Sequence, residues 1–400
     1  MRFHLPKLFE APKSVENDVP VADGIRALCI LGIMAYHIWQ QSWLEPSISV
    51  LGLTLNFNWV VRCGYLLVDG MLTLSGFLIF LPYARAALDD SPSPRVLPFY
   101  QNRAARIFPS YYLCILVMLF LIALPNHEYG DTRTLLVDLL SHLTFTQVFF
   151  PAAYTYTHLN VVLWTLAVEM EFYLIFPWIA RAFRKFPLIT YSAMVAAAFA
   201  YRYLYAASFS DTTHYINQLP AMLDVYANGM MASYAYVTVK RSLRENRATA
   251  LLFTLCSGVC LYVIYRLFDG QMRENGYDMI RLGQMERRYA LSLSFATLIL
   301  SLSCAVKPLQ WLFGNRFMRF LSNISFQMYI WHSPLMLRMK VWRFPAYVSE
   351  ANPQFYHEPV WQVRYTYWAF ALSFLIGIAL TYGFERPLAR RLRSKAKRKQ

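Results

Sequence analysis

Residues 107–124 read IFPSYYLCILVMLFLIAL and contain no charged side chain. A helix of this length spans about 27 Å, close to the roughly 30 Å thickness of the apolar core of a bilayer. The whole 400-residue chain has a similar character, since 57% of it is hydrophobic and only 15% is charged. Soluble domains are nearer half apolar and a quarter charged. The sequence therefore predicts a membrane protein.

Nine further segments share this length and apolar content. The ten are approximately 24–43, 60–82, 107–124, 161–180, 187–206, 219–239, 248–267, 289–306, 320–337 and 364–384. We expect each to form a transmembrane helix, so the fold class is an all-α polytopic membrane protein with about ten transmembrane helices. The expected domains are an N-terminal segment 1–22, a transmembrane domain 23–387 and a basic tail 388–400.

Basic residues are distributed unevenly between the two sides of such a ten-span chain. The side that holds both termini carries 26 of the 38 Lys and Arg residues. Because basic loops remain in the cytoplasm, we expect both termini to be cytoplasmic, in the inner or plasma membrane. The net charge of +15 then reflects topology, and no nucleic-acid partner is expected. The six cysteines form no CxxC pair, so no metal site is expected.

Arg26 and His37 lie eleven residues apart in the first apolar segment. Eleven residues are about three helical turns and about 16 Å of rise, so the two side chains share one helix face. We expect Arg26 at the cytoplasmic end of the helix and His37 near the middle of the bilayer. Ionisable residues at that depth are costly and tend to mark function. The alternative is a packing histidine satisfied by a neighbouring helix.

Two further groups of polar residues lie just before the third segment and in the fourth. Arg103 and Arg106 are three residues apart and suit a clamp on phosphate, although basic residues there are also an ordinary topology signal. Thr165, Glu169 and Tyr173 recur every four residues and form one polar stripe. A carboxylate inside an apolar helix needs a partner such as His or Arg.

The second and ninth segments hold the remaining candidates. Asp69 and Ser75 lie in the second segment, where Ser75 and the glycine after it also suit a close contact between helices. Ser325, Tyr329 and His332 share one face of the ninth segment. For each group, packing is the alternative to a role in catalysis.

Six motifs occur together in one order along the chain. They are Arg26-x10-His37, Asp69 followed by Leu-Ser-Gly-Phe-Leu-Ile at 74–79, Arg103-x-x-Arg106-Ile-x-Pro109, Trp164-Thr-Leu-x-Val-Glu169-x-x-Phe-Tyr173 with Pro177, Ser325-Phe-x-x-Tyr329-x-Trp-His332, and Glu385-x-Pro387. In these motifs the chain resembles the membrane acyltransferase family 3, from about residue 22 to 387. It departs from the family pattern at Ala27 and at Met71-Leu72, which are not titratable.

The resemblance implies transfer of an acyl group, usually acetyl, from cytoplasmic acetyl-CoA or another acyl-CoA. The acceptor would be a hydroxyl of an extracytoplasmic glycan or glycolipid. The resemblance points to His37 as the catalytic residue and places Arg26, Arg103 and Arg106 near the CoA phosphates. We expect Glu169 to orient the imidazole of His37, as in hydrolase triads. The residues expected to bind substrate or support the site are Asp69, Ser75, Trp164, Tyr173, Tyr329 and His332.

Other functions and steps remain open at this stage. His37 suits either a general base or a nucleophile that forms an acyl intermediate. A buried His and Glu also suit a membrane transporter or flippase of a glycan or lipid-linked sugar, because such residues serve proton relays. The sequence leaves open the acceptor, the acyl group and the oligomeric state. Membrane lipid, acyl-CoA and the acceptor are the expected partners.

Overall fold

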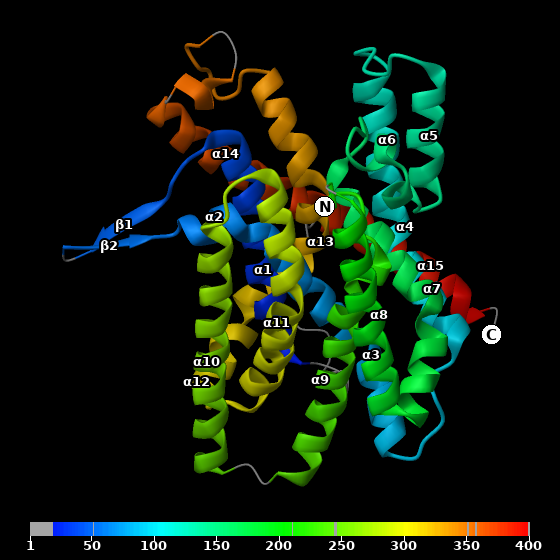
Figure 1. Ribbon diagram of the computed structural model, residues 1–400. Helices are drawn as coiled ribbons and strands as arrows, with labels where there is room; N and C mark the ends of the chain where they lie inside the picture. Colours follow the sequence, from blue (N-terminus) through cyan, green and yellow to red (C-terminus); the bar gives the residue numbers. More distant parts are fainter. Residues whose placement is uncertain are drawn as a thin grey trace, which may run out of the picture.

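The computed structural model describes residues 19–50, 52–209, 211–243, 246–349, 352–356 and 358–398, and consists almost entirely of helices (Figure 1). Residues 1–18 of the expected N-terminal segment and 399–400 of the expected tail lie outside this description. The elements are α1 (Pro20–Ser42), β1 (Ser47–Val50), β2 (Leu53–Asn56), α2 (Asn58–Cys63), η1 (Gly64–Leu66), α3 (Leu67–Leu88), α4 (Val96–Val117), η2 (Met118–Ala123), α5 (Thr132–Leu143), η3 (Gln147–Phe149), α6 (Pro151–Tyr154), η4 (Val161–Leu163), α7 (Trp164–Lys185), α8 (Pro187–Ser208), η5 (Leu219–Met222), α9 (Leu223–Ser242), α10 (Arg247–Met272), α11 (Tyr277–Cys304), α12 (Lys307–Gly314), α13 (Arg316–Val341), η6 (Pro353–Tyr356), α14 (Pro359–Leu380), η7 (Thr381–Glu385) and α15 (Arg386–Arg398).

Local sequence signals fix where several of these helices begin. Pro20, Pro187 and Pro359 open α1, α8 and α14, at a position where the missing N–H removes no helical hydrogen bond. The side chains of Asn246 and Asn315 cap α10 and α13 by accepting from backbone N–H groups of the first turn. These caps satisfy donors that the helix itself leaves unpaired.

The predicted segments all fall on helices, but their number as spans is not settled by length and composition. In the part of the chain that the structure describes, six helices are long and apolar enough to cross a membrane, or seven if the bent α11–α13 stretch counts as one. Inward-facing polar side chains such as Asn228 in α9 and Gln327 in α13 lower the hydropathy of the other helices. An all-α membrane protein fits these observations, and the count of about ten spans stays a prediction.

The peripheral helices expose apolar surface. Only 17% of the apolar window of α10 and 22% of that of the α14–α15 stretch is buried. The outward side chains of α10 include Leu251, Leu255 and Val259. An apolar outer face is what a bilayer requires of a helix at the edge of a bundle, whereas a soluble protein rarely exposes one.

Helices α3 and α9 pack backbone to backbone. A Cβ on Gly229 would lie 2.1 Å from the carbonyl oxygen of Thr73, and one on Gly76 would lie 2.7 Å from that of Tyr226. Small residues permit such an approach between membrane helices. The close contact that the Ser75–Gly76 pair predicts is therefore confirmed.

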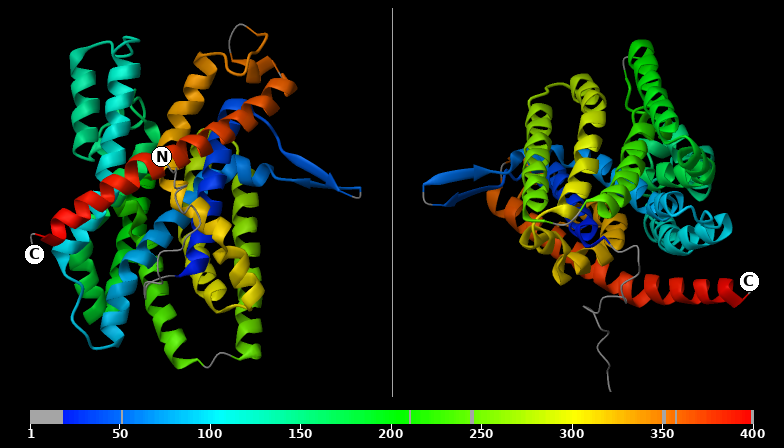
Figure 2. Two further views of the ribbon diagram at one scale, coloured as in Figure 1. Left: turned by 180° about the vertical axis from the view of Figure 1, so that it is seen from behind. Right: turned by 90° about the horizontal axis from the view of Figure 1, so that it is seen from below.

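A β-hairpin follows α1 and projects sideways from the helices (Figures 1 and 2). Its strands are antiparallel, with Ile48 opposite Leu55, and both side chains are more than half exposed. The sequence analysis treated this stretch only as the connection between the first two segments. The strands are four residues each, too short to give a clear alternating pattern.

The connections gather at two ends of the molecule. The α3–α4 connection lies at the lower end of Figure 1, as does the first turn of α10. The α4–α5 connection and the last turn of α13 lie at the upper end. This grouping agrees with the predicted topology, in which successive apolar segments cross in alternate directions. The assignment of one end to the cytoplasm stays a prediction.

Candidate active site

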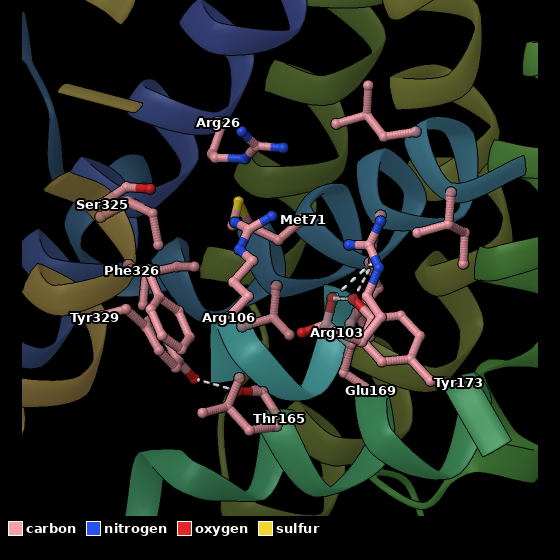
Figure 3. Close-up of a pocket in the computed structure, with 18 residues that line it drawn as sticks. Arg26, Met71, Arg103, Arg106, Thr165, Glu169, Tyr173, Ser325, Phe326 and Tyr329 are labelled. Atoms are coloured by element: carbon pink, nitrogen blue, oxygen red, sulfur yellow. Dashed lines mark hydrogen bonds between the residues drawn. The ribbon is translucent and has the colours of Figure 1, made fainter. Parts of the chain in front are cut away.

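A cavity of about 160 Å³ opens between α1, α3, α4, α7 and α13 (Figure 3). Nine of the polar residues that the sequence singles out line it: Arg26, Ser75, Arg103, Arg106, Thr165, Glu169, Tyr173, Ser325 and Tyr329. The other four, His37, Asp69, Trp164 and His332, lie outside the lining. The structure therefore brings together residues from five helices far apart in the sequence, and separates the two histidines from them.

Arg26 reaches into the cavity from α1 and is anchored to α13. Its Nη1 donates to Ser322 Oγ at 3.1 Å and lies 3.9 Å from Asp23 Oδ1. Asp23 also accepts from Ser322 at 2.7 Å and pairs with Arg319 at 3.4 Å. Because Asp23 is shared between two arginines, the charge of Arg26 is only partly compensated.

Arg103 and Arg106 enter the cavity from α4, and Figure 3 shows Arg106 approaching Arg26. The guanidinium carbon of Arg103 lies 5.4 Å from the Tyr173 ring centroid, and its Nε is buried without a hydrogen-bond partner. The guanidinium carbon of Arg106 lies 6.0 Å from the centroid of the Phe326 ring. Among the described residues, neither arginine forms an ion pair with a carboxylate. Half-buried cations without partners suit an anionic ligand, which would compensate their desolvation.

Glu169, on α7, has partners other than the one expected. Its Oε1 accepts hydrogen bonds from Ser75 Oγ at 2.7 Å and from Tyr173 OH at 2.5 Å (Figure 3). Among the described residues, Glu169 has no hydrogen bond with His37, and its hydrogen bonds lie within the arginine-lined cavity. The described lining holds three arginines against this one carboxylate, so the cavity is positively charged.

His37 instead pairs with His332. His37 Nδ1 lies 2.8 Å from His332 Nε2, and His332 Nδ1 lies 2.6 Å from the carbonyl oxygen of Tyr329. A carbonyl can only accept, so His332 Nδ1 carries its proton and the neutral ring accepts at Nε2. His37 Nδ1 then donates to His332. In a neutral His37 this leaves Nε2 unprotonated and able to take a proton.

The cavity follows one face of α1 toward this histidine pair. Arg26, Ile30 and Ile33 line it, and His37 comes next on the same helical stripe. His37 is about 16 Å along the helix from Arg26 but only about 8 Å from Ser42, where α1 ends. The histidine therefore lies nearer to the Ser42 end of α1 than to Arg26.

Tyr329 connects the cavity and the histidine pair. Its hydroxyl lies 2.8 Å from Thr165 Oγ1 and donates to the Val162 carbonyl at 2.9 Å. The backbone carbonyl oxygen of Tyr329 accepts a hydrogen bond from His332 Nδ1. Trp164 packs edge-on against Tyr154.

Asp69 belongs to a structural ion pair. Its Oδ1 lies 3.2 Å from Arg288 Nε, and both side chains are almost fully buried. Arg288 also donates to the Ile216 carbonyl. The observed geometry favours the packing alternative for Asp69, because a removal of either partner would leave a buried charge.

A second buried pair, and its arginine, escaped the sequence analysis. Arg202 and Asp224 form two hydrogen bonds, at 3.1 and 2.6 Å, between α8 and α9. The available signal was an arginine inside an apolar segment, which is as unusual as a carboxylate there. In the described residues, no group of three or more His, Cys, Asp or Glu side chains is arranged to hold a metal ion.

Comparisons with known proteins agree with the motifs. A family model described as an acyltransferase domain matches residues 20–393. YrhL of Bacillus subtilis is 24% identical over 367 residues, which are 85% of this chain and 51% of that protein. The peptidoglycan O-acetyltransferase OatA of Listeria monocytogenes is 22% identical over 338 residues, which are 80% of this chain and 49% of that protein.

The chain thus spans about half the length of these two relatives. No solved structure matches it. The family match contains all the helices that line the cavity and both histidines of the pair. It confirms the resemblance drawn from the six motifs, and the chain belongs to the membrane acyltransferase family 3.

Proposed function

We propose that this multi-pass membrane protein is an O-acyltransferase that moves an acetyl group from cytoplasmic acetyl-CoA to a hydroxyl of an extracytoplasmic glycan or glycolipid. The observation that carries the proposal is the alignment of two features on α1. A cavity with three arginines lies toward one end of the helix, and a hydrogen-bonded histidine pair lies toward the other. A donor with a charged end and a thin acyl-bearing arm fits that alignment.

The arginines would hold the diphosphate of the donor. Arg103 and Arg106 lack carboxylate partners among the described residues, and charge-assisted hydrogen bonds to phosphate are strong. The pantetheine arm would extend along Ile30 and Ile33 and bring the thioester to His37. Glu169 would keep Ser75 and Tyr173 in place beside the arginines, a supporting role rather than a contact with the reacting atoms.

His37 would act as the general base. Its Nε2 takes the proton from the acceptor hydroxyl while the hydroxyl oxygen attacks the thioester carbonyl. The carbon–sulfur bond then breaks, and the departing CoA thiolate recovers the proton from His37. His332 would fix the orientation and tautomer of His37 through its hydrogen bond to the Tyr329 carbonyl. The competing route, an acyl-His37 intermediate, would appear as a mass increase on that residue after incubation with donor alone.

The acceptor is proposed from the site and from one relative. His37 lies near the end of α1 that we expect to face outward, within reach of an extracytoplasmic hydroxyl. The Listeria relative is named as a peptidoglycan O-acetyltransferase, which supports a cell-wall glycan as the acceptor. Both termini would be cytoplasmic in the inner or plasma membrane, as the Lys/Arg distribution predicts.

A donor assay tests the function directly. The purified protein should bind acetyl-CoA and release free CoA when soluble peptidoglycan fragments are present, with labelled acetyl recovered on the glycan. A transporter or flippase has no reason to bind acetyl-CoA. Movement of a lipid-linked sugar across proteoliposomes, with no binding or cleavage of acetyl-CoA, would contradict the proposal and support the alternative.

A further inference from the structure

A second polar cavity, of about 590 Å³, lies at the end of α3. It is an open hollow between the last turns of α3, the α3–α4 connection and the last turns of α9. Three basic residues line it: Arg85, Lys240 and Arg241. The acidic residue in its lining is Asp89, which pairs with Arg241. The described part of the lining thus holds three basic side chains and one acidic side chain, and the volume is in the range of small-molecule sites.

This second cavity continues the first along one face of α3. Ser75 and Ile79 line the arginine cavity, and Pro82 and Ala86 line the second cavity. These four residues recur at intervals of three or four, so they form one stripe on the helix. From Ile79 to Ala86 is two turns, or about 10 Å. The two cavities therefore lie one after the other along the same face of α3.

The order of the two cavities relative to His37 follows from the packing of α1 on α3. A Cβ on Gly32 would lie 2.2 Å from Leu67, at the first turn of α3. Arg26, one and a half turns earlier in α1, lines the first cavity together with Ser75, further along α3. The two helices therefore run antiparallel. Along the bundle the order is His37, the Arg26 cavity, then the cavity at Arg85.

Acyl-CoA has its functional groups in the same order. The acyl thioester ends the pantetheine arm, the diphosphate follows, and beyond it come the ribose 3′-phosphate and the adenine. If the thioester reaches His37 and the diphosphate meets the three arginines, the ribose must point toward the cavity at the end of α3. The anionic group that remains there is the 3′-phosphate.

We infer that the cavity lined by Arg85, Lys240 and Arg241 binds the 3′-phosphoadenosine end of the donor. The basic side chains contact the 3′-phosphate, and Tyr236 in the same lining offers an aromatic ring beside the adenine. The inference rests on the proposed function, because it needs acyl-CoA as the donor. It adds that the protein distinguishes acyl-CoA from acyl donors that lack the 3′-phosphate.

The test compares acetyl-CoA with 3′-dephospho-acetyl-CoA by binding calorimetry on the purified full-length protein. The wild type should bind acetyl-CoA at least about tenfold more tightly, as expected for loss of charge-assisted hydrogen bonds. Lys240→Ala and Arg241→Ala should weaken binding of acetyl-CoA and leave that of the dephospho donor unchanged. Lys240 is exposed and lies near the helix end, so that variant should fold even if Arg241→Ala disturbs the turn.

Lys185→Ala, a basic residue at the end of α7 outside both cavities, is the matched control and should preserve the discrimination. Equal wild-type affinity for the two donors would overturn the inference and leave the proposed function intact. So would discrimination that survives in both variants. Failure of the wild type to bind either donor would instead overturn the proposed function.

Discussion

At the scale of single residues, the histidine pair is defined by a backbone group. The Tyr329 carbonyl fixes the proton on His332, and His332 in turn fixes the proton on His37. This chain of hydrogen bonds runs through the main chain of α13 and cannot be read from the spacing of side chains. It gives His332 a positioning role, which the sequence analysis could only describe as support.

His332→Ala should lower kcat by about 10- to 100-fold with little change in KM for donor, because His37 Nδ1 loses its acceptor while the arginine cavity is intact. His332→Gln, whose amide oxygen can accept from His37, should recover part of the rate. Steady-state kinetics with acetyl-CoA measure both. If Ala and Gln variants were equally slow, His332 would be a packing residue.

The unpaired arginines should distinguish donors by their phosphates. Arg103→Ala and Arg106→Ala should weaken binding of acetyl-CoA by about tenfold or more, since hydrogen bonds to charged groups contribute about 1.5–3 kcal/mol. A short acetyl thioester without the nucleotide should bind with unchanged affinity. Arg62→Ala, an arginine outside the cavity that stacks on Trp39, serves as the control. Equal losses with both donors would assign the pair to folding.

The sequence predicts which side chains lie close together where both are on one helix, because helical spacing alone then decides their positions. Arg26 and His37 share a face as predicted, since both are on one helix. Spacing does not give the partners of Glu169, because they depend on which helix packs against α7. Arg288 likewise finds Asp69 across the bundle, and no sequence pattern fixes that pairing.

At the scale of elements, hydropathy located the helices well. Each predicted apolar segment corresponds to a helix, because an apolar run of this length forms its backbone hydrogen bonds internally. The β1–β2 hairpin was missed, since its strands are short and lie in a connection. The break between α11 and α12 falls at the end of a predicted segment, 289–306.

The α3–α9 contact makes a specific prediction. Gly229→Ala places a Cβ against the α3 backbone and should lower stability by about 1–3 kcal/mol, the usual range for overpacking. Gly258→Ala, on α10, meets nothing within 4 Å and should be neutral or slightly stabilising. Thermal unfolding of the two purified variants in one detergent compares them. If the two variants had the same Tm, α3 and α9 could move apart to admit the Cβ without loss of stability, and the prediction would be wrong.

At the scale of the whole molecule, the prediction to test is the orientation of the protein in the membrane. Reporters fused within residues 89–95 or at Gln400, which lies outside the described residues, should read cytoplasmic. A reporter in the 125–160 loop should read extracytoplasmic. The prediction follows from the placement of 26 of 38 basic residues on one side. Reports from the same side for 89–95 and 125–160 would contradict the ten-span topology.

Family membership and the general fold class were accessible from the sequence, because six motifs occur in order along the chain and its apolar runs are long. The shape of the cavity was not accessible. It depends on five helices converging, and on glycine contacts that set their separation.

The measurement that tests the central claim most directly is the acetylation of envelope glycans in cells that lack the native gene and express either the wild type or His37→Ala at equal membrane levels. Mass spectrometry of the isolated glycans counts acetyl groups, and calorimetry on the purified variant checks that acetyl-CoA still binds. The account predicts acetylated glycan with the wild type and a loss of at least about 100-fold with His37→Ala, while donor binding persists because the arginines are about 16 Å away. Near-normal acetylation by His37→Ala would contradict it.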